Sequence, residues 1–171
     1  QNTGYLFSGT VGGGSASGSS NMNISDFSGR TTSSKLTIYG SVSDDRMNFN
    51  IDRTSEQTGS FDISLGDGND WVMFRTLSSD SVDMGAGDDE VGIYINSGEA
   101  ANVHSLTKLD GGAGTDTLNL SSSGYGEAGA TLTLTHRGAT NFENLIGTSV
   151  NETINGDSNA NILMGSGGAD T

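Results

Sequence analysis

The chain has 171 residues, the size of one ordinary domain, and carries 21 acidic against 7 basic residues, a formal net charge of −14. Leu, Ile, Val and Phe together make up just under one fifth of it. Such low aliphatic content with high net charge is typical of chains that do not fold on hydrophobic burial alone. We therefore expect a bound cation to relieve the repulsion between carboxylates and to add ligand bonds.

The composition excludes several classes of site and partner. The chain has no cysteine, which rules out thiolate zinc sites, iron–sulfur clusters and disulfides. Its histidines, His104 and His136, stand far apart in unrelated contexts, so we interpret them as ordinary histidines rather than ligands. Calcium needs neither residue type, because it prefers carboxylate and carbonyl oxygens. The acidic pI of 4.1 argues against nucleic acid, which requires a basic face.

The sequence also bears on membranes and on processing. No apolar run approaches the ~20 residues of a membrane-spanning helix, so we expect no membrane insertion. No positively charged leader precedes an apolar stretch, so no signal peptide is expected. The first residue is Gln1 rather than Met, which we interpret as the start of a processed or excised piece.

Along the chain, residues 1–23 form a Gly/Ser/Asn-rich segment that we interpret as flexible, and residues 24–171 carry the structured domain. Within 24–171, short alternations of apolar and polar residues recur between Gly, Asp and Asn, a pattern typical of β-strands. No window combines sufficient length with an apolar stripe at helical spacing, so we expect little helix. The strands are expected over 36–39, 47–51, 61–63, 118–120 and 131–135.

The strongest signal is an internal repeat, the nonapeptide Gly-Gly-x-Gly-x-Asp-x-U-x, in which U is a large apolar residue. Units 65–73 and 84–92 match at the second, fourth, sixth and eighth places, and unit 111–119 also matches at the first. Degenerate units begin at Gly40, Gly147, Gly156 and Gly165. Glycine allows positive φ and close approach of backbones, so carbonyl oxygens can converge beside the sixth-place carboxylate. The eighth residue then points inward, because side chains alternate along a strand.

These units resemble the repeats-in-toxin (RTX, hemolysin-type) calcium-binding proteins, and residues 141–149 resemble a typical lead-in to such arrays. The resemblance implies an all-β fold, a right-handed parallel β-roll or β-solenoid in which two nonapeptides make one coil and neighbouring coils share Ca2+. Right-handed crossovers are also the general rule for parallel strands. The remaining alternative is a β-solenoid whose glycine turns hold no metal.

On this reading, calcium lies between turns 65–70 and 84–89, and again between 84–89 and 111–116. The predicted ligands are the sixth-place carboxylates Asp70, Asp89, Asp116 and Asp170, the second choices Asp67 and Asp88, and the turn glycines Gly66, Gly68, Gly85, Gly87, Gly112 and Gly114. Glu152 and Asn161 weaken the units 147–155 and 156–164, and we expect the latter to face a metal-free edge. The buried eighth-place residues should be Val72, Val91, Leu118, Ile154 and Leu163.

No catalytic motif is present, so we do not expect an enzyme. The first hypothesis is a secreted structural module of a bacterial surface layer, matrix fibre or adhesin, folded by extracellular calcium. The alternative is a calcium-triggered secretion and folding tail of an extracellular enzyme. A third is a ligand-binding solenoid with Thr131, Thr133 and Thr135 as a flat row. Expected partners are copies of the chain or further coils joined end to end, with cell-surface polysaccharide as a candidate ligand.

Overall fold

The computed structural model describes residues 20–24, 35–49, 60–74, 80–93, 108–121, 128–135 and 138–171. Over these ranges the chain is all-β with almost no helix, and every strand pairing is parallel, which confirms the expected fold class at this level. Residues 1–19, most of the segment interpreted as flexible, lie outside the described residues. No helix in the described ranges has the length and apolar character needed to cross a membrane.

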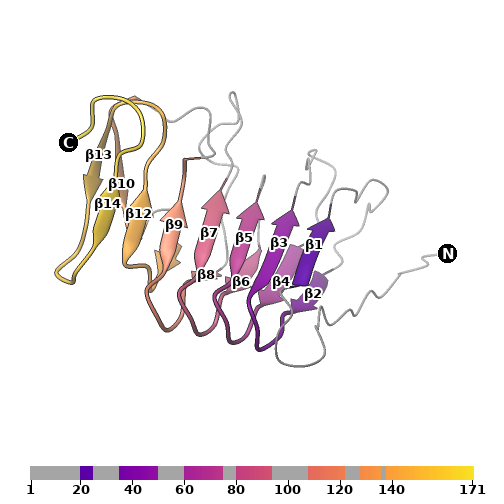
Figure 1. The fold of residues 1–171 in the computed structure, drawn as a ribbon. Helices are drawn as coiled ribbons and strands as arrows, with labels where there is room; N and C mark the ends of the chain where they lie inside the picture. Colours follow the sequence, from indigo (N-terminus) through magenta and orange to yellow (C-terminus); the bar gives the residue numbers. More distant parts are fainter. Residues whose placement is uncertain are drawn as a thin grey trace.

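Two parallel sheets contain most of the strands (Figure 1). The seven-stranded sheet has, in spatial order, β1 (Ser20–Ile24), β3 (Asp45–Phe49), β5 (Trp71–Phe74), β7 (Glu90–Ile93), β9 (Thr117–Asn119), β12 (Asn144–Ile146) and β14 (Ile162–Met164). The five-stranded sheet has β11 (Ala139–Thr140), β8 (Lys108–Asp110), β6 (Ser81–Asp83), β4 (Ser60–Ser64) and β2 (Lys35–Tyr39). A third, two-stranded sheet pairs β10 (Ala130–Thr133) with β13 (Glu152–Asn155).

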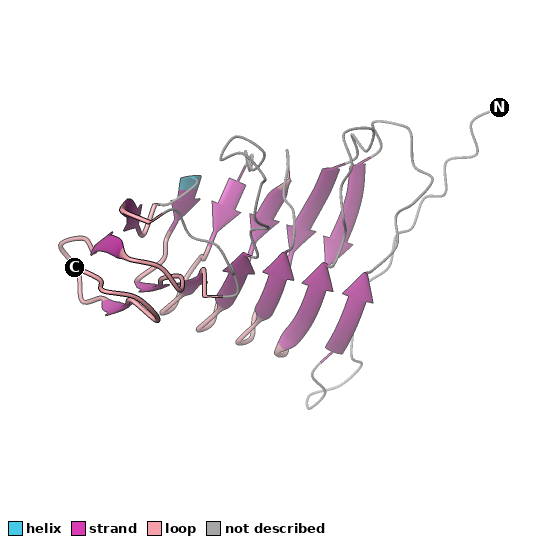
Figure 2. Ribbon diagram, turned by 90° about the horizontal axis from the view of Figure 1, so that it is seen from above, coloured by secondary structure: helices cyan, strands magenta, loops and turns pink. Residues whose placement is uncertain are grey.

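From β1 to β9 the chain alternates strictly between the two large sheets, one strand at a time. Figure 2 shows the strands of one layer running opposite to those of the other, as this alternation requires. Each strand therefore pairs with the strand two places later in sequence, as when Val72 of β5 aligns with Val91 of β7, and Val91 with Leu118 of β9. Residues at the same place in successive repeats are thereby brought into rows.

The core lies between the two large sheets. Most strands alternate between buried and partly exposed residues, as the period-two pattern of the sequence predicts. Val72, Val91 and Leu118 are fully buried, as predicted. Three aromatic rings fill the N-terminal part of the core: Phe49 stacks on Phe74 with ring centroids 5.0 Å apart, and Phe61 lies 5.3 Å from Phe49.

Two predicted core residues behave differently. Ile154 is only partly buried against the core, and Leu163 is 40% exposed, so the prediction of a buried Leu163 is wrong. The reason is its position in β14, the last strand of its sheet, which has β12 on one side and no described strand on the other. Trp71 is partly covered on the outer face of β5, with the guanidinium carbon of Arg46 3.9 Å from its ring centroid.

The core predicts different costs for two leucines at the same place in the repeat. Leu118→Ala should lower the free energy of unfolding by about 2–5 kcal/mol, because it leaves a cavity among fully buried side chains. Leu163→Ala should change it by less than about 0.5 kcal/mol, because that side chain is already exposed. Urea denaturation of both variants measures the difference, and equal losses would contradict the assigned core.

Candidate metal centre

The three well-matched turns lie side by side along one edge of the molecule, the lower edge in Figure 1. Residues 65–70 connect β4 to β5, residues 84–89 connect β6 to β7, and residues 111–116 connect β8 to β9. Their third-place residues form isolated parallel bridges, Asp67 with Ala86 and Ala86 with Ala113. The three repeats therefore form one stack.

Glycine at the second place permits this close stacking. Gly66, Gly85 and Gly112 have φ of 105°, 106° and 103°, a region that residues with side chains rarely adopt. A Cβ at Gly85 would also collide with the carbonyl oxygen of Gly66 in the turn before it. The motif glycines thus determine both the shape of each turn and the separation between turns.

The sixth-place carboxylates form a ladder through the stack. Asp70 Oδ1 accepts a hydrogen bond from the backbone N–H of Asp45 at 2.7 Å, and Asp89 Oδ1 accepts one from the N–H of Asp70 at 2.7 Å. Asp116 Oδ1 accepts from the N–H of Asp89 at 2.9 Å, and Glu143 Oε2 from the N–H of Asp116 at 2.9 Å. Each carboxylate therefore satisfies a backbone donor of the preceding turn.

A second ladder runs through the fifth places, in the opposite sense. The backbone N–H of Asn69 donates to Asp44 Oδ1 at 2.9 Å, that of Asp88 to Asn69 Oδ1 at 3.0 Å, and that of Thr115 to Asp88 Oδ1 at 2.9 Å. These side chains are exposed. Asp88, a second-choice ligand, takes part in this ladder as both donor and acceptor. Asp67, the other second-choice ligand, is exposed at the third place.

The inner oxygens of the sixth-place carboxylates have no partner. Asp70, Asp89 and Asp116 are at most 2% exposed, and the Oδ2 atom of each is buried without a hydrogen bond. Burial, together with neighbouring carboxylates, raises the pKa of Asp70 to about 7 and that of Asp116 to about 6, and it also raises the pKa of Asp89. A raised carboxyl pKa destabilises the fold progressively as the pH rises from the unfolded value of 3.8 through the folded value.

A calcium ion fits this arrangement. Buried carboxylate oxygens without donors, in a row of like charges, are the groups that a hard cation would satisfy. Neighbouring carboxylates one strand spacing apart repel by roughly 3 kcal/mol at an effective dielectric constant of 20. Among the described residues, no three His, Asp or Glu side chains form a metal cluster by themselves. A calcium ion bound here would be held by Asp70, Asp89 and Asp116, whose Oδ2 atoms have no hydrogen-bond partner, together with carbonyl oxygens of the turns.

Two members of the ladder, Asp45 and Glu143, were not predicted from the sequence. Glu143 lies 27 residues after Asp116, and Asp116 lies 27 after Asp89, so the repeated spacing was the available signal. A search for the glycine pattern does not find this spacing, because the turn before Glu143 lacks the motif. Asp45 belongs to a degenerate unit with serine in place of the second and fourth glycines.

We expected unit 156–164 on the opposite edge from the well-matched turns, but the structure places it on the same edge. Its strand β14 pairs with β12 in the seven-stranded sheet, and Asn161 Nδ2 donates to the carbonyl of Glu143 at 2.9 Å. Turn 156–161 therefore continues the stack of Asp70, Asp89 and Asp116. Asp170, the remaining predicted ligand, belongs to the two-turn stack beside β13, where its Oδ1 accepts from the N–H of Glu152 at 3.0 Å.

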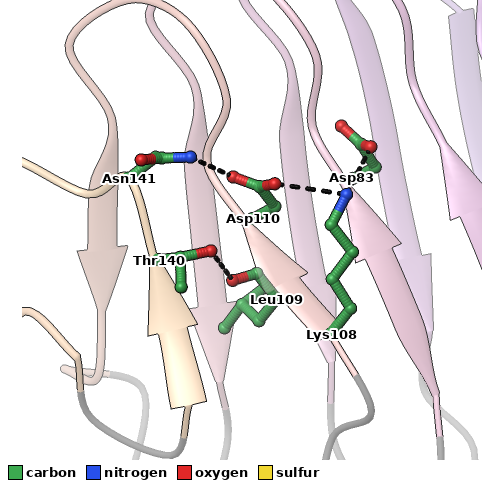
Figure 3. Close-up of polar contacts among 6 residues, drawn as sticks. All are labelled: Asp83, Lys108, Leu109, Asp110, Thr140 and Asn141. Atoms are coloured by element: carbon green, nitrogen blue, oxygen red, sulfur yellow. Dashed lines mark hydrogen bonds and ion pairs between the residues drawn. The ribbon is translucent and has the colours of Figure 1, made fainter.

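A different acidic group, on the five-stranded sheet, already has a cation from the chain itself (Figure 3). Lys108 Nζ lies 2.7 Å from Asp83 Oδ2 and 3.2 Å from Asp110 Oδ2. The hydrogen bond to Asp83 raises the pKa of Lys108. Burial opposes ionisation of Asp110, but hydrogen bonds from Asn141 and Lys108 outweigh it and lower the pKa of Asp110. These acids are paired, in contrast to those of the turns.

No protein-family model matches the chain, and neither a curated protein nor a solved structure gives a match.

Substitutions at Asp89 distinguish the contribution of its ladder hydrogen bond to stability from that of its buried charge. Asp89→Asn retains an oxygen for the N–H of Asp70 but removes the buried charge, so with chelator it should be at least as stable as the wild type. Asp89→Ala also removes the acceptor and should cost about 1–3 kcal/mol under the same conditions. Both variants should lose most of the rise in melting temperature that calcium produces. Equal calcium titrations for the wild type and Asp89→Ala would exclude Asp89 as a ligand.

Proposed function

We propose that this chain is an extracellular calcium-binding β-roll of the RTX type, with a structural role in a bacterial surface layer, matrix fibre or adhesin. The observation that carries the proposal is the row of buried carboxylates, each with an oxygen that has no partner. Calcium supplies the missing partner. The role is then mechanical: the ion joins coils that would otherwise repel each other.

The topology supports a right-handed parallel roll. Successive strands alternate between two parallel sheets, and the glycine turns connect the sheets along one edge. Parallel crossovers are right-handed in nearly all known cases. In such a roll the same turn recurs at the same height in each coil, so a cation between two turns is bound by both.

The energetics favour folding outside the cell. A ligand that binds only the folded state stabilises it by about 2.7 kcal/mol per site at one hundred times Kd. Extracellular modules bind calcium at roughly 10⁻⁴–10⁻³ M, well above the calcium level inside a cell. Because the net stability of a folded domain is only about 5–15 kcal/mol, a contribution of this size changes the balance between the folded and unfolded chain.

The alternative function is a calcium-triggered folding and secretion tail of an extracellular enzyme. The same turns would serve that function, because folding on export needs only the difference in calcium across the cell boundary. The complete parent gene distinguishes the two: an enzyme domain in the same reading frame favours the tail, and further rolls or surface-anchoring domains favour the structural module.

Association end to end is part of the proposal. The apolar residues of β14, Ile162, Leu163 and Met164, are 61%, 40% and 51% exposed, in a strand with one free edge among the described residues. A free edge that carries apolar side chains pairs readily with another strand. We propose a further coil as its partner, from the parent chain or from a second copy.

Cell-surface polysaccharide is a second proposed partner. A pocket beside β10 has both polar and apolar lining residues, which include Thr133, Thr135, Asn141, Asp157 and Asn159 as well as Leu134 and Phe142. Sugars are recognised by such polar groups, because hydroxyls and amides both donate and accept hydrogen bonds and a carboxylate accepts them. The hydroxyls of Thr133 and Thr135 lie 3.2 Å apart at one side of it.

Calcium should control folding. We expect the strand signal in circular dichroism and the melting temperature to rise together as millimolar calcium is added to chelated protein. The same concentration of magnesium should have a much smaller effect, because it retains its waters and demands octahedral geometry. An unchanged strand signal with chelator and with calcium would contradict the proposal.

Association should depend on β14. Ile162→Lys should reduce the concentration-dependent growth in light scattering in calcium, because it places a charge on the free edge. Val42→Lys is the matched control, since Val42 is 77% exposed in turn 40–45 at a distance from that edge. A wild type that stays monomeric at all concentrations, or an equal effect of both variants, would contradict end-to-end association through β14.

A further inference from the structure

Three of the four degenerate turns contain a contact that the well-matched turns lack. In turn 40–45, the second-place backbone N–H, from Ser41, donates to Asp45 Oδ2 at 2.7 Å. The Ser41 hydroxyl lies 3.1 Å from the same oxygen and 3.2 Å from the carbonyl of Ser43. It also accepts the N–H of Ser43 at 3.2 Å. The inner carboxylate oxygen of this turn is thus satisfied by the turn itself.

The same arrangement recurs in turn 147–152, on the other edge of the molecule. The N–H of Thr148 donates to Glu152 Oε2 at 3.0 Å, and its hydroxyl donates to Glu152 Oε1. The N–H of Val150, at the fourth place, donates to the Thr148 hydroxyl at 3.4 Å. Second, fourth and sixth places therefore have the same roles as in turn 40–45.

Turn 156–161 repeats it with a carboxylate at the second place. The N–H of Asp157 donates to Asn161 Oδ1 at 2.9 Å, and Asp157 Oδ1 accepts the N–H of Asn159 at 2.8 Å. We call these three turns closed, because the second-place residue makes the contacts inside the turn. They occur on both edges, so the arrangement follows the local sequence rather than the position in the stack.

Turns 65–70, 84–89 and 111–116 are open by the same criterion. Their second-place residue is glycine at φ near +105°, so no side chain enters the turn. The inner oxygens of Asp70, Asp89 and Asp116 have no partner, whereas that of Asp45 has two donors. The oxygen of Asp45 that lacks a partner is Oδ1, the counterpart of the oxygens that accept ladder bonds in the later turns.

We propose that the second-place residue decides which turns take a cation. This inference rests on the proposed calcium function and deepens it. A second-place Ser, Thr or Asp with negative φ donates its own backbone N–H to the sixth-place side chain. Its side-chain oxygen also accepts the backbone N–H of the fourth-place residue. These contacts take the place of the ion. A second-place residue with positive φ makes neither contact, and the sixth-place carboxylate is then free to bind a cation.

Turn 165–170 tests whether the side chain or the backbone conformation is decisive. Its second place is Ser166, a hydroxyl residue as in the closed turns, but its φ is 71°, and Gly168 at the fourth place has φ of 112°. Both values are positive, as at the same places in the open turns. The rule therefore assigns this turn, with Asp170, to the cation-binding group and assigns turns 147–152 and 156–161 to the metal-free group.

The sharpest experiment opens a closed turn. In Ser41→Gly the hydroxyl is lost, and glycine can adopt the positive φ of the open turns beside Asp45. Turn 40–45 is adjacent to turn 65–70, since a Cβ at Gly66 would collide with the carbonyl of Ser41. Isothermal titration of the full chain with calcium should give an additional equivalent over the wild type. Ser43→Gly is the matched control: it deletes the same hydroxymethyl group two residues later, retains the contacts of Ser41, and should leave the stoichiometry unchanged.

Melting temperatures give an independent measurement on the same proteins. Ser41→Gly should melt below the wild type with chelator, because Asp45 loses its internal donors, and should show a larger rise on addition of calcium. An unchanged number of equivalents in a folded Ser41→Gly protein, or the same gain in Ser43→Gly, would overturn the inference while leaving calcium binding by the wild type intact. Absence of calcium binding by the wild type would overturn both the inference and the proposed function.

Discussion

One hydrogen bond, repeated from turn to turn, organises this molecule: a backbone N–H at the sixth place of a repeat donates to the carboxylate at the sixth place of the next. It aligns each turn with the next, and the strands that follow the turns pair in the same register. Val72, Val91 and Leu118 therefore lie in one row. In the three glycine-rich turns the carboxylates that accept it, those of Asp70, Asp89 and Asp116, are also buried. The same contact that aligns the coils therefore places negative charges close together in a poorly solvated row.

This conflict explains the composition of the chain. A fold that buries acids side by side is stable only if something positive or some donor reaches their second oxygens. The chain provides hydroxyls and backbone N–H groups in some turns, and a lysine for Asp83 and Asp110 on the sheet surface. In the three glycine-rich turns it provides nothing of its own, and we propose that calcium does so.

The sequence predicted the parts of the structure that depend on local chemistry. Glycines at the second and fourth places gave the turn geometry, and the apolar eighth place gave the core residues Val72 and Leu118. Contacts between coils were harder to predict. Glu143 joins the carboxylate ladder although no glycine motif precedes it, because register, not motif, brings it beside Asp116. Leu163 occupies a core place in the repeat yet is exposed, because burial needs a neighbouring coil as well as a period.

The two edges of the molecule differ in how much their lengths vary. On the stacked edge, residues 65–70, 84–89 and 111–116 connect the sheets with segments of identical length. In contrast, the number of residues from the end of one strand to the start of the next differs between β5 and β6, separated by 75–80, and β7 and β8, separated by 94–107. Register is set on one edge, so the other can accept insertions without disturbing it. Evolution, or a protein engineer, could therefore vary sequence and length at that margin and display new peptide segments on a scaffold whose periodic part stays constant.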